Sequence, residues 1–366
     1  MTKGTILVAA GGTGGHVMPA TSLAGALKAK GWDVHFVTDP RGETFARDEG
    51  LSAQVLPLKG RTNFFQYALS LLRSFLTAFL ILHRKNICAV VSFGGYVAFP
   101  VNLAAIVARK PLILHEQNAY IGRVNRWFFP FCKKLALSWP KTHGLEALFT
   151  ASPKITLCGL PVRKDFETLR NNDYFPPVAD VPFELLVVGG SQGASFFAQI
   201  IPKALARLPE KLQKRVRLSL QCPPANLEEV KRHCQIGNIK AEISVYFKDM
   251  DKKLAKAHWV MCRAGASSLA EVALAGRPAL FVPYPHAMDD HQTYNAASFA
   301  DNGAGWRSAQ KDLTPEVLAT HLMKIFEEPA SLLFAAEKVR AQAKMDAPVQ
   351  LAAVIEGAIT PKVLQD

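Results

Sequence analysis

Short apolar runs alternate with longer, helix-like stretches along most of the chain. Most of the runs end at glycine or at polar residues, which is typical of buried strands. Regular alternation of strands and helices predicts βαβ units and parallel sheets. The predicted strands are Ile6–Ala10, Val34–Thr38, Ala89–Ser92, Leu112–His115, Leu135–Ser138, Leu185–Val188, Ser244–Phe247, Val260–Cys262 and Ala279–Pro283.

A strand that enters a glycine-rich turn and then a helix occurs twice. Ile6–Ala10 leads into Gly11–Gly15, and Leu185–Val188 leads into Gly189–Gly193. A chain of 366 residues is also long for a single hydrophobic core. The sequence therefore predicts two doubly wound halves with a hinge near Gly159. Ligands of open α/β sheets lie beyond the carboxyl ends of the strands, so we expect them in the cleft between the halves.

The positive charge of the chain is concentrated in its N-terminal part. The formal net charge is +13, and residues 1–162 hold 18 Lys and Arg against 7 Asp and Glu. Between Gly50 and Leu145 the only acid is Glu116. Such a region is either a solvated basic face or a surface for an anion such as lipid headgroups, diphosphate or nucleic acid. No nucleic-acid motif accompanies it, so we expect no nucleic-acid partner and favour anionic membrane lipids.

The segment Phe64–Leu82 contains one charge, Arg73. Its several polar residues and this central arginine disfavour a membrane span. Apolar residues at helical spacing with cations around them are typical of a helix that lies in the membrane interface, and the alternative is an ordinary core helix. The expected membrane contacts are Phe75, Leu76, Phe79 and Leu82, with Arg73, Arg84 and Lys85 as the neighbouring cations.

The glycine loop Gly11–Gly15 suits an anion, because glycine lets backbone N–H groups approach it and a helix N-terminus follows. The spacing does not match the dinucleotide-binding pattern, although Asp39 at the end of the second strand keeps that alternative open. A second candidate is the turn Gly265–Ala270. A diphosphate would lie at this helix start with Glu271 on the ribose, whereas Ser268 and Glu271 also match a capping box.

No metal site or cofactor is expected. The six cysteines are scattered, without a Cys-x-x-Cys pair, which fits a reducing compartment. Asp289–His291 lacks a further ligand at recognisable spacing. Asp249–Asp251 matches a manganese-binding Asp-x-Asp pattern, but its place before a helix favours N-capping.

Several segments together resemble the MurG family of UDP-N-acetylglucosamine:undecaprenyl-diphospho-muramoylpentapeptide N-acetylglucosaminyltransferases. The resemblance spans nearly the whole chain in the right order, with Ala98, Phe99, Leu160 and Met18 as departures. The matching segments are Gly11–Ala20, Phe93–Val97, His115–Asn118, Pro161–Arg163, Val188–Ala194, Cys262–Glu271 and Phe281–Pro283.

The resemblance implies a GT-B fold of two Rossmann-like domains, and inverting, metal-independent transfer. Residues 1–162 would bind the acceptor and the membrane, with a C-terminal helix at about 345–366 packing back on them, and residues 163–344 would bind the donor. Gly12, Gly94, Gly95 and Tyr96 would face the acceptor diphosphate. The implied donor contacts are Thr13, Gly14, Gly15, Asn118, Arg163, Ser191, Phe247, Gly265, Ala266, Ser267, Ser268, Leu269, Ala270, Glu271, His291 and Gln292.

The family's role implies peptidoglycan synthesis at the cytoplasmic face of the plasma membrane, with UDP-GlcNAc and undecaprenyl-diphospho-MurNAc-pentapeptide as substrates and cell-wall and division proteins as partners. Two residues compete as the general base that deprotonates the acceptor hydroxyl. His16 starts the first predicted helix, and an ordinary imidazole pKa of about 6.5 suits proton removal near neutrality. Glu116 ends a strand and would act as the base or orient a neighbour.

Three rival functions stay open at this point. The first is a glycosyltransferase of the same architecture with another acceptor. The second is an NAD-dependent oxidoreductase, which the glycine spacing disfavours. The third is a membrane adaptor without activity, which would leave both glycine loops without a role.

Overall fold

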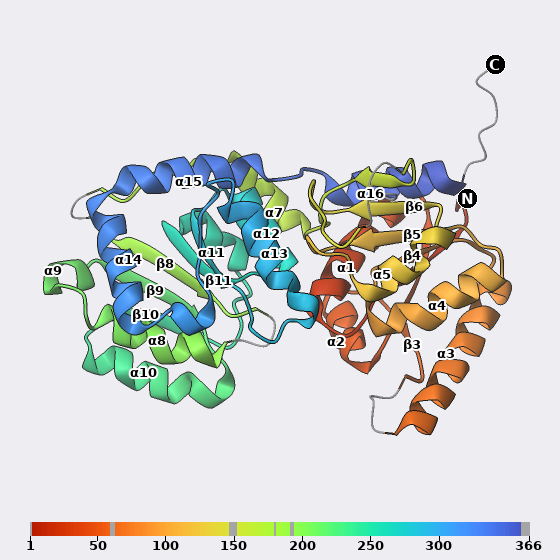
Figure 1. Ribbon diagram of the computed structural model, residues 1–366, viewed down its shortest axis with the longest axis horizontal. Coiled ribbons are helices and arrows are strands. Elements are labelled where there is room, and N and C mark those ends of the chain that lie inside the picture. The colour runs from red at the N-terminus through yellow and green to blue at the C-terminus, as the bar shows by residue number, and fades with distance from the viewer. Residues whose placement is uncertain (1, 59–62, 146–151, 179–180, 191–193, 360–366) are drawn as a thin grey trace, which may run out of the picture. The chain divides into compact units, whose positions relative to one another are not determined.

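The computed structural model describes residues 2–58, 63–145, 152–178, 181–190 and 194–359. The chain divides into two compact units. The first unit comprises Met1–Arg163 and Lys344–Asp366, and the second comprises Lys164–Ala343. Each unit is an α/β sandwich with its own sheet and core (Figure 1).

Within its described residues, the first unit holds a seven-stranded sheet in the order β3-β2-β1-β4-β5-β6-β7. All neighbouring strands in this order are parallel. Its strands are β1 (Thr5–Ala9), β2 (Asp33–Thr38), β3 (Ala53–Val55), β4 (Ile87–Ser92), β5 (Leu112–Glu116), β6 (Lys134–Leu137) and β7 (Ile155–Leu157).

Helices cover both faces of this sheet, because successive side chains of each strand point to opposite faces. Ile6 and Val8 of β1 join the core that includes residues of α1 and α16, whereas Leu7 and Ala9 join the core beneath α3 and α4. The helices are α1 (Gly14–Ala29), α2 (Pro40–Asp48), α3 (Phe64–Arg84), α4 (Gly95–Val107), α5 (Arg123–Phe128) and α16 (Ala347–Ile359), with a 3-10 turn, η1 (Phe129–Phe131), after α5.

The second unit repeats this design with a six-stranded parallel sheet, in the order β10-β9-β8-β11-β12-β13 among the residues described. Its strands are β8 (Phe183–Val188), β9 (Val216–Gln221), β10 (Lys240–Ser244), β11 (Trp259–Arg263), β12 (Ala279–Val282) and β13 (Trp306–Arg307). The helices are α7 (Lys164–Glu167), α8 (Ser195–Leu205), α9 (Glu210–Gln213), α10 (Leu227–Ile236), α11 (Met250–Lys256), α12 (Ala266–Ala275), α13 (His291–Ala300), α14 (Pro315–Glu327) and α15 (Pro329–Ala341). The 3-10 turns are η2 (Thr168–Asn171), η3 (Pro224–Asn226), η4 (Met288–Asp290) and η5 (Gln310–Asp312).

The expected fold class, two Rossmann-like α/β halves, is confirmed, but one predicted strand is misplaced. The sequence predicts a strand at Ser244–Phe247, and the structure has β10 at Lys240–Ser244 instead. This strand lies at the edge of its sheet, and its first three residues are exposed. Exposed edge residues need not be apolar, so the apolar pattern that marks buried strands is missing there.

The last described helix, α16, packs on α1 of the first unit. Its anchor is Glu356, whose carboxylate accepts hydrogen bonds from Trp32 Nε1 at 3.0 Å, Lys30 Nζ at 2.9 Å and Lys3 Nζ at 3.1 Å. These donors lower the pKa of Glu356 from its ordinary 4.5 to about 2, with the Trp32 bond as the largest cause. Leu351 and Ile355 add fully buried apolar contacts.

We expect Glu356→Gln to loosen α16 by about 1 kcal/mol, since a partly exposed ion pair contributes little more than this. Amide hydrogen exchange in α16 should then accelerate about fivefold at neutral pH. Because the folded pKa is lowered, the wild-type contribution is complete above the unfolded pKa of 4.5 and disappears as the pH falls through about 2. Glu337→Gln, at an exposed site on α15, is the control; equal exchange in both variants would contradict the anchor.

Candidate active site

The first glycine loop, Gly11–Gly15, joins β1 to α1. A Cβ atom on Gly11 would lie 2.4 Å from Cγ2 of Val97, so only glycine fits there. Gly12 has φ +89, a conformation that also favours glycine. Gly14 is buried, Gly15 is exposed, and Thr13 is the N-cap of α1. The loop is therefore a closely packed turn that leads directly into a helix N-terminus.

A second glycine loop, Gly94–Tyr96, follows β4 and starts α4. It lies against the first loop. A Cβ on Gly12 would lie 3.4 Å from Cε1 of Tyr96, and one on Gly95 would lie 3.8 Å from Nε2 of His16. His16 is half-buried, and its Nδ1 lies 3.3 Å from Oγ1 of Thr13. The structure thus brings together the predicted base and the residues expected to face the acceptor diphosphate.

Asp39 connects these two loops, a role that the sequence did not reveal. Its Oδ1 accepts hydrogen bonds from the backbone N–H groups of Gly12 at 2.8 Å and Gly42 at 3.0 Å, and its Oδ2 accepts one from the Tyr96 hydroxyl. The residue is 1% exposed. Burial raises its pKa, but the bonds from Tyr96, Gly12 and Gly42 outweigh burial and leave the pKa below its ordinary value. Both oxygens are occupied, which leaves Asp39 unsuited to a dinucleotide ribose.

These contacts also show how Gly12 is held. Its N–H donates to Asp39, so this amide stabilises the loop. The expectation that Gly12 faces the acceptor diphosphate stays a prediction.

Glu116 ends β5 and is 1% exposed. Its Oε1 accepts from the N–H of Asn118 at 3.0 Å, and its Oε2 accepts from the N–H of Gly122 at 2.9 Å and Nδ2 of Asn125 at 2.8 Å. Burial is the largest influence on this carboxyl and raises its pKa, although the three donors act against it. The geometry favours Glu116 as the residue that shapes the turn carrying Asn118, because its carboxylate accepts from that turn and from Asn125 at the start of α5.

His115, next to Glu116, is buried and faces the ring of Phe93, with centroids 4.9 Å apart. Its Nε2 lies 3.2 Å from the carbonyl oxygen of Gly159. Burial lowers the pKa of His115 to about 4, so the ring is neutral at physiological pH. This histidine connects β5 to the segment where the first unit ends.

The predicted donor turn leads from β11 into α12. Gly265 is the N-cap of α12 and makes no side-chain cap bond, so Ser268 lies inside the first helical turn. This corrects the capping-box alternative, because Ser268 does not occupy the cap position. Ser267 and Glu271 are half-buried, while Ala266, Leu269 and Ala270 are buried. The hydroxyl oxygen of Ser267 is buried and has no hydrogen-bond partner among the described residues.

The start of α13, after the loop that follows β12, carries two further donor candidates, His291 and Gln292. Gln292 accepts a hydrogen bond at Oε1 from the N–H of Tyr284 at 2.9 Å, and His291 Nδ1 lies 2.7 Å from the carbonyl oxygen of Met288. Asp289 and Asp290 both have positive φ, 53 and 51. Two consecutive non-glycine residues in this conformation store strain, which proteins retain mainly at functional sites.

Arg263, at the end of β11, is a second residue that sequence reasoning missed. Its buried guanidinium donates to the carbonyl oxygen of Pro283 at 3.1 Å and to Oε1 of Gln310 at 2.5 Å. It also stacks on the rings of Phe197 and Tyr284 at 4.9 and 5.6 Å. Arg263 therefore ties the start of the donor turn to the Tyr284–Gln292 loop.

The other predicted donor contacts are scattered. Phe247 is buried beneath the ammonium group of Lys253, which lies 4.7 Å from its ring. Arg163 ends the first unit, with NH1 3.9 Å from Oε1 of Glu49. Ser191 lies outside the described residues. In the part of the chain that the structure describes, no group of three or more His, Cys, Asp or Glu side chains is placed to hold a metal ion.

Comparisons with known proteins agree with this geometry. Residues 6–137 match the glycosyltransferase family 28 N-terminal domain, and residues 184–351 match the C-terminal domain of that family. A relative from Paramagnetospirillum magneticum, named UDP-N-acetylglucosamine--N-acetylmuramyl-(pentapeptide) pyrophosphoryl-undecaprenol N-acetylglucosamine transferase, is 40% identical and covers 98% of this chain and 97% of its own. A relative of the same name from Rhodospirillum rubrum is 38% identical over 98% of this chain and 93% of its own. The crystal structure of Acinetobacter baumannii MurG is 30% identical, with a TM-score of 0.78 over 96% of this chain and 99% of that one.

The chain belongs to the MurG family of glycosyltransferases. The resemblance found in the sequence is thereby confirmed. The calicheamicin glycosyltransferase CalG4, 17% identical with a TM-score of 0.67, shares the fold alone.

In this MurG-family chain the departure at Phe99 adds an aromatic contact. Its ring meets Trp127 and Phe128 edge-on, with centroids 6.2 and 5.4 Å apart. Ala98 beside it is fully buried. Phe99 therefore packs α4 against α5.

Among the described residues, one helix is long and apolar enough to cross a membrane, Phe65–Arg84 in α3, and 28% of it is buried inside the protein. Its exposed apolar side chains are those of Phe65, Leu69, Leu72, Leu76 and Leu80.

The expectation that Leu82 contacts a membrane is wrong, because Leu82 is fully buried in the core. Phe75 and Phe79 are half-buried against that core, whereas Arg73, Arg84 and Lys85 are exposed. Helical periodicity therefore identified the amphipathic helix. Its outward face in the structure carries Leu72, Leu76 and Leu80.

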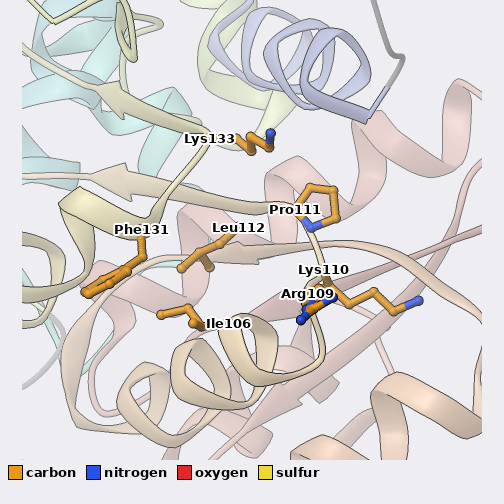
Figure 2. A pocket seen from close by; sticks show the side chains of 7 residues that line it. All are labelled: Ile106, Arg109, Lys110, Pro111, Leu112, Phe131 and Lys133. Carbon is orange, nitrogen blue, oxygen red and sulfur yellow. The ribbon is translucent and has the colours of Figure 1, made fainter.

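A cavity of about 250 Å³ lies where α4 ends, β5 begins and η1 ends (Figure 2). Ile106, Leu112 and Phe131 form an apolar wall with Pro111, and the charged lining residues are Arg109, Lys110 and Lys133. It sits at the amino ends of β5 and β6, the opposite edge of the sheet from the glycine loops. Ligands of open α/β sheets bind beyond the carboxyl ends, so this cavity is not the sugar site.

We expect Glu116→Gln to destabilise the first unit by about 1–3 kcal/mol, because a glutamine NH₂ would face one of the N–H donors that now bind the carboxylate. Chemical denaturation with hydrogen exchange resolved to the first unit measures this effect. Glu43→Gln, at an exposed position on α2, is the matched control. A stable Glu116→Gln protein would show that the network does not shape the Asn118 turn.

Proposed function

We propose that this chain transfers N-acetylglucosamine from UDP-GlcNAc to the 4-hydroxyl of the muramoyl sugar of undecaprenyl-diphospho-MurNAc-pentapeptide. The observation that carries the proposal is the similarity to relatives of that activity over almost the full length of both chains. The packing of His16 against the second glycine loop supports it, since this places a titratable group beside the turns proposed for the acceptor. An enzyme of the same family with another acceptor is the alternative.

The proposed mechanism is a single in-line displacement. The acceptor hydroxyl attacks the anomeric carbon of the donor sugar, His16 removes its proton, and UDP leaves. The N-terminus of α12 would stabilise the charge of the leaving diphosphate through backbone N–H groups. The Ser267 hydroxyl at this helix start, which has no hydrogen-bond partner within the described parts of the chain, is suited to the same anion. Glu116 keeps the Asn118 turn in shape and takes no proton.

Transfer of labelled N-acetylglucosamine from UDP-GlcNAc to a lipid-linked muramoyl-pentapeptide tests the function. We expect the same rate with and without EDTA. Transfer to a different lipid but not to this acceptor would favour the alternative, and loss of activity with EDTA would contradict metal independence.

His16→Ala should change kcat and leave the donor KM unchanged, whereas Glu271→Ala should change the donor KM. Each variant therefore serves as the control for the other. Loss of a general base lowers kcat by about 10²–10⁴ and removes the acidic limb of its pH profile, with donor binding unchanged. Loss of a carboxylate on the ribose raises the donor KM about tenfold or more. If the acidic limb survives in His16→Ala and vanishes in Glu116→Gln, the base is Glu116.

We further propose that the chain attaches peripherally to the cytoplasmic face of the plasma membrane through α3. Exposed leucines on this helix would enter the interface, and Arg73, Arg84 and Lys85 would attract anionic lipid by about 1 kcal/mol each. The cationic cavity at Arg109, Lys110 and Lys133 would add attraction for lipid phosphate. Cell-wall and division proteins as partners belong to the same proposal.

Replacing Leu72, Leu76 and Leu80 together by Ser should weaken the affinity for anionic vesicles about tenfold or more. The protein should stay folded, because these side chains are already exposed. The matched control replaces three exposed apolar residues of the second unit, Ile236, Val317 and Leu333, by Ser. Vesicle cosedimentation and circular dichroism measure binding and folding. Equal loss in both triple variants would contradict attachment through α3.

A further inference from the structure

We propose that Asp39 is a positioning residue for glycosyl transfer, which clamps the first glycine loop to Tyr96 and so fixes His16 relative to the acceptor. The inference rests on the proposed function, but its structural part can be measured without activity.

Asp39 is the N-cap of α2, and a cap needs only the bond from the Gly42 N–H. Asp39 also accepts from Gly12 N–H and from the Tyr96 hydroxyl, residues 27 and 57 positions away in the chain. A serine or asparagine would serve as a cap equally well. The bond from the Tyr96 hydroxyl needs the second carboxylate oxygen, because an asparagine would present an N–H donor in its place.

These bonds join three separate strand-to-helix connections. Gly12 lies between β1 and α1, Asp39 between β2 and α2, and Tyr96 at the start of α4 after β4. No local sequence interaction holds such connections in register. A buried carboxylate that accepts several N–H and O–H donors is a strong, directional link. The sheet already holds the ends of β1 and β4 together, because the Phe93 N–H donates to the carbonyl oxygen of Ala9 at 2.9 Å. Asp39 adds a side-chain link beyond this point and so helps to fix the distance between the two glycine loops.

His16 depends on that distance. Its ring lies between Thr13 Oγ1, at 3.3 Å from Nδ1, and the position that a Cβ on Gly95 would occupy, at 3.8 Å from Nε2. If the two loops separate, the imidazole ring of His16 loses its contact with the Gly95 side of the second loop. Misplacement of a reacting group by about 1 Å can cost about 100-fold in rate.

Arg41 balances the charge of this clamp. Its Nε lies 3.5 Å from Oδ2 of Asp39, its NH2 donates to the Tyr96 hydroxyl at 3.4 Å, and 63% of its side chain is exposed. An unbalanced carboxylate beside the glycine loops would repel an acceptor diphosphate. The exposed guanidinium removes this repulsion and offers a cation toward the solvent side of the loops.

The test is a double-mutant cycle with Asp39→Asn, Tyr96→Phe and the combined variant, with Glu43→Gln on the same helix as the control. We expect kcat/KM for the lipid-linked acceptor to fall about 10- to 100-fold in Asp39→Asn. Tyr96→Phe should fall by a similar factor, the combined variant no further than Asp39→Asn alone, and the donor KM should stay within about twofold. A donor KM that rises as much as the acceptor effect, or two factors that multiply, would overturn the clamp.

A second measurement reads the clamp without any substrate. Burial raises the pKa of Tyr96, and the hydrogen bond to Asp39 raises it further. The ultraviolet difference between the wild type and Tyr96→Phe gives the titration of Tyr96. The same difference is then measured between Asp39→Asn and the combined variant. We expect the Tyr96 titration to lie at lower pH in this second pair. An unchanged titration would overturn the clamp. If the shift occurs but the wild type transfers nothing to the lipid-linked acceptor, the proposed function fails and the clamp stands.

Discussion

The parallel arrangement of both sheets is the constraint from which the rest of the molecule follows. Because all strands run the same way, every strand delivers its carboxyl end to one edge of the sheet. In the first unit, this edge collects the turns after β1, β2, β4 and β5, which are far apart in sequence. The opposite edge collects only the entries to the strands, including the cationic cavity at Arg109 and Lys133. Topology thus separates the glycine loops at one edge of the sheet from the cationic cavity at the other.

Where the four turns meet, buried backbone N–H groups need hydrogen-bond acceptors, and two carboxylates provide them. Asp39 accepts from Gly12 and Gly42, and Glu116 accepts from Asn118 and Gly122. Each acid is 1% exposed and satisfied within its own unit. A buried charge without partners would be costly, whereas a carboxylate that accepts several N–H bonds organises the turns around it. The same two residues looked like ligand or proton acceptors in the sequence, because a polar residue at a strand end gives no indication of whether it faces a substrate or a neighbouring turn.

The same difference between local patterns and contacts distant in sequence separates the features that the sequence predicts from those that it does not. Strands buried on both faces, such as β1 and β5, were predictable from their continuous apolar runs, and the glycine loops from their spacing. Short or exposed edge strands such as β3 and β10 were not, since their pairing depends on neighbours and not on a strong local pattern. The link from Asp39 to Tyr96 was invisible because it spans 57 positions. The family resemblance supplied donor residues that no local pattern could assign.

For helix α3, the sequence pattern predicts the helix correctly but not which of its faces points outward. Apolar spacing predicted a helix with a bulky apolar stripe, but the outward face assigned from it included Leu82, which the structure buries. In the structure, Ser70, Ser74 and Ala78 face inward, while Leu72 and Leu76 face outward. A helix of a soluble domain buries its large apolar residues and exposes its small polar ones, so α3 has the reverse arrangement over these turns. Small residues allow close packing against α4, and the exposed leucines contribute nothing to the core. An arrangement that exposes large apolar side chains is stabilising only where the surroundings of the helix are themselves apolar, which is why the outward face of α3, and not its hydrophobicity as a whole, supports the proposed contact with lipid.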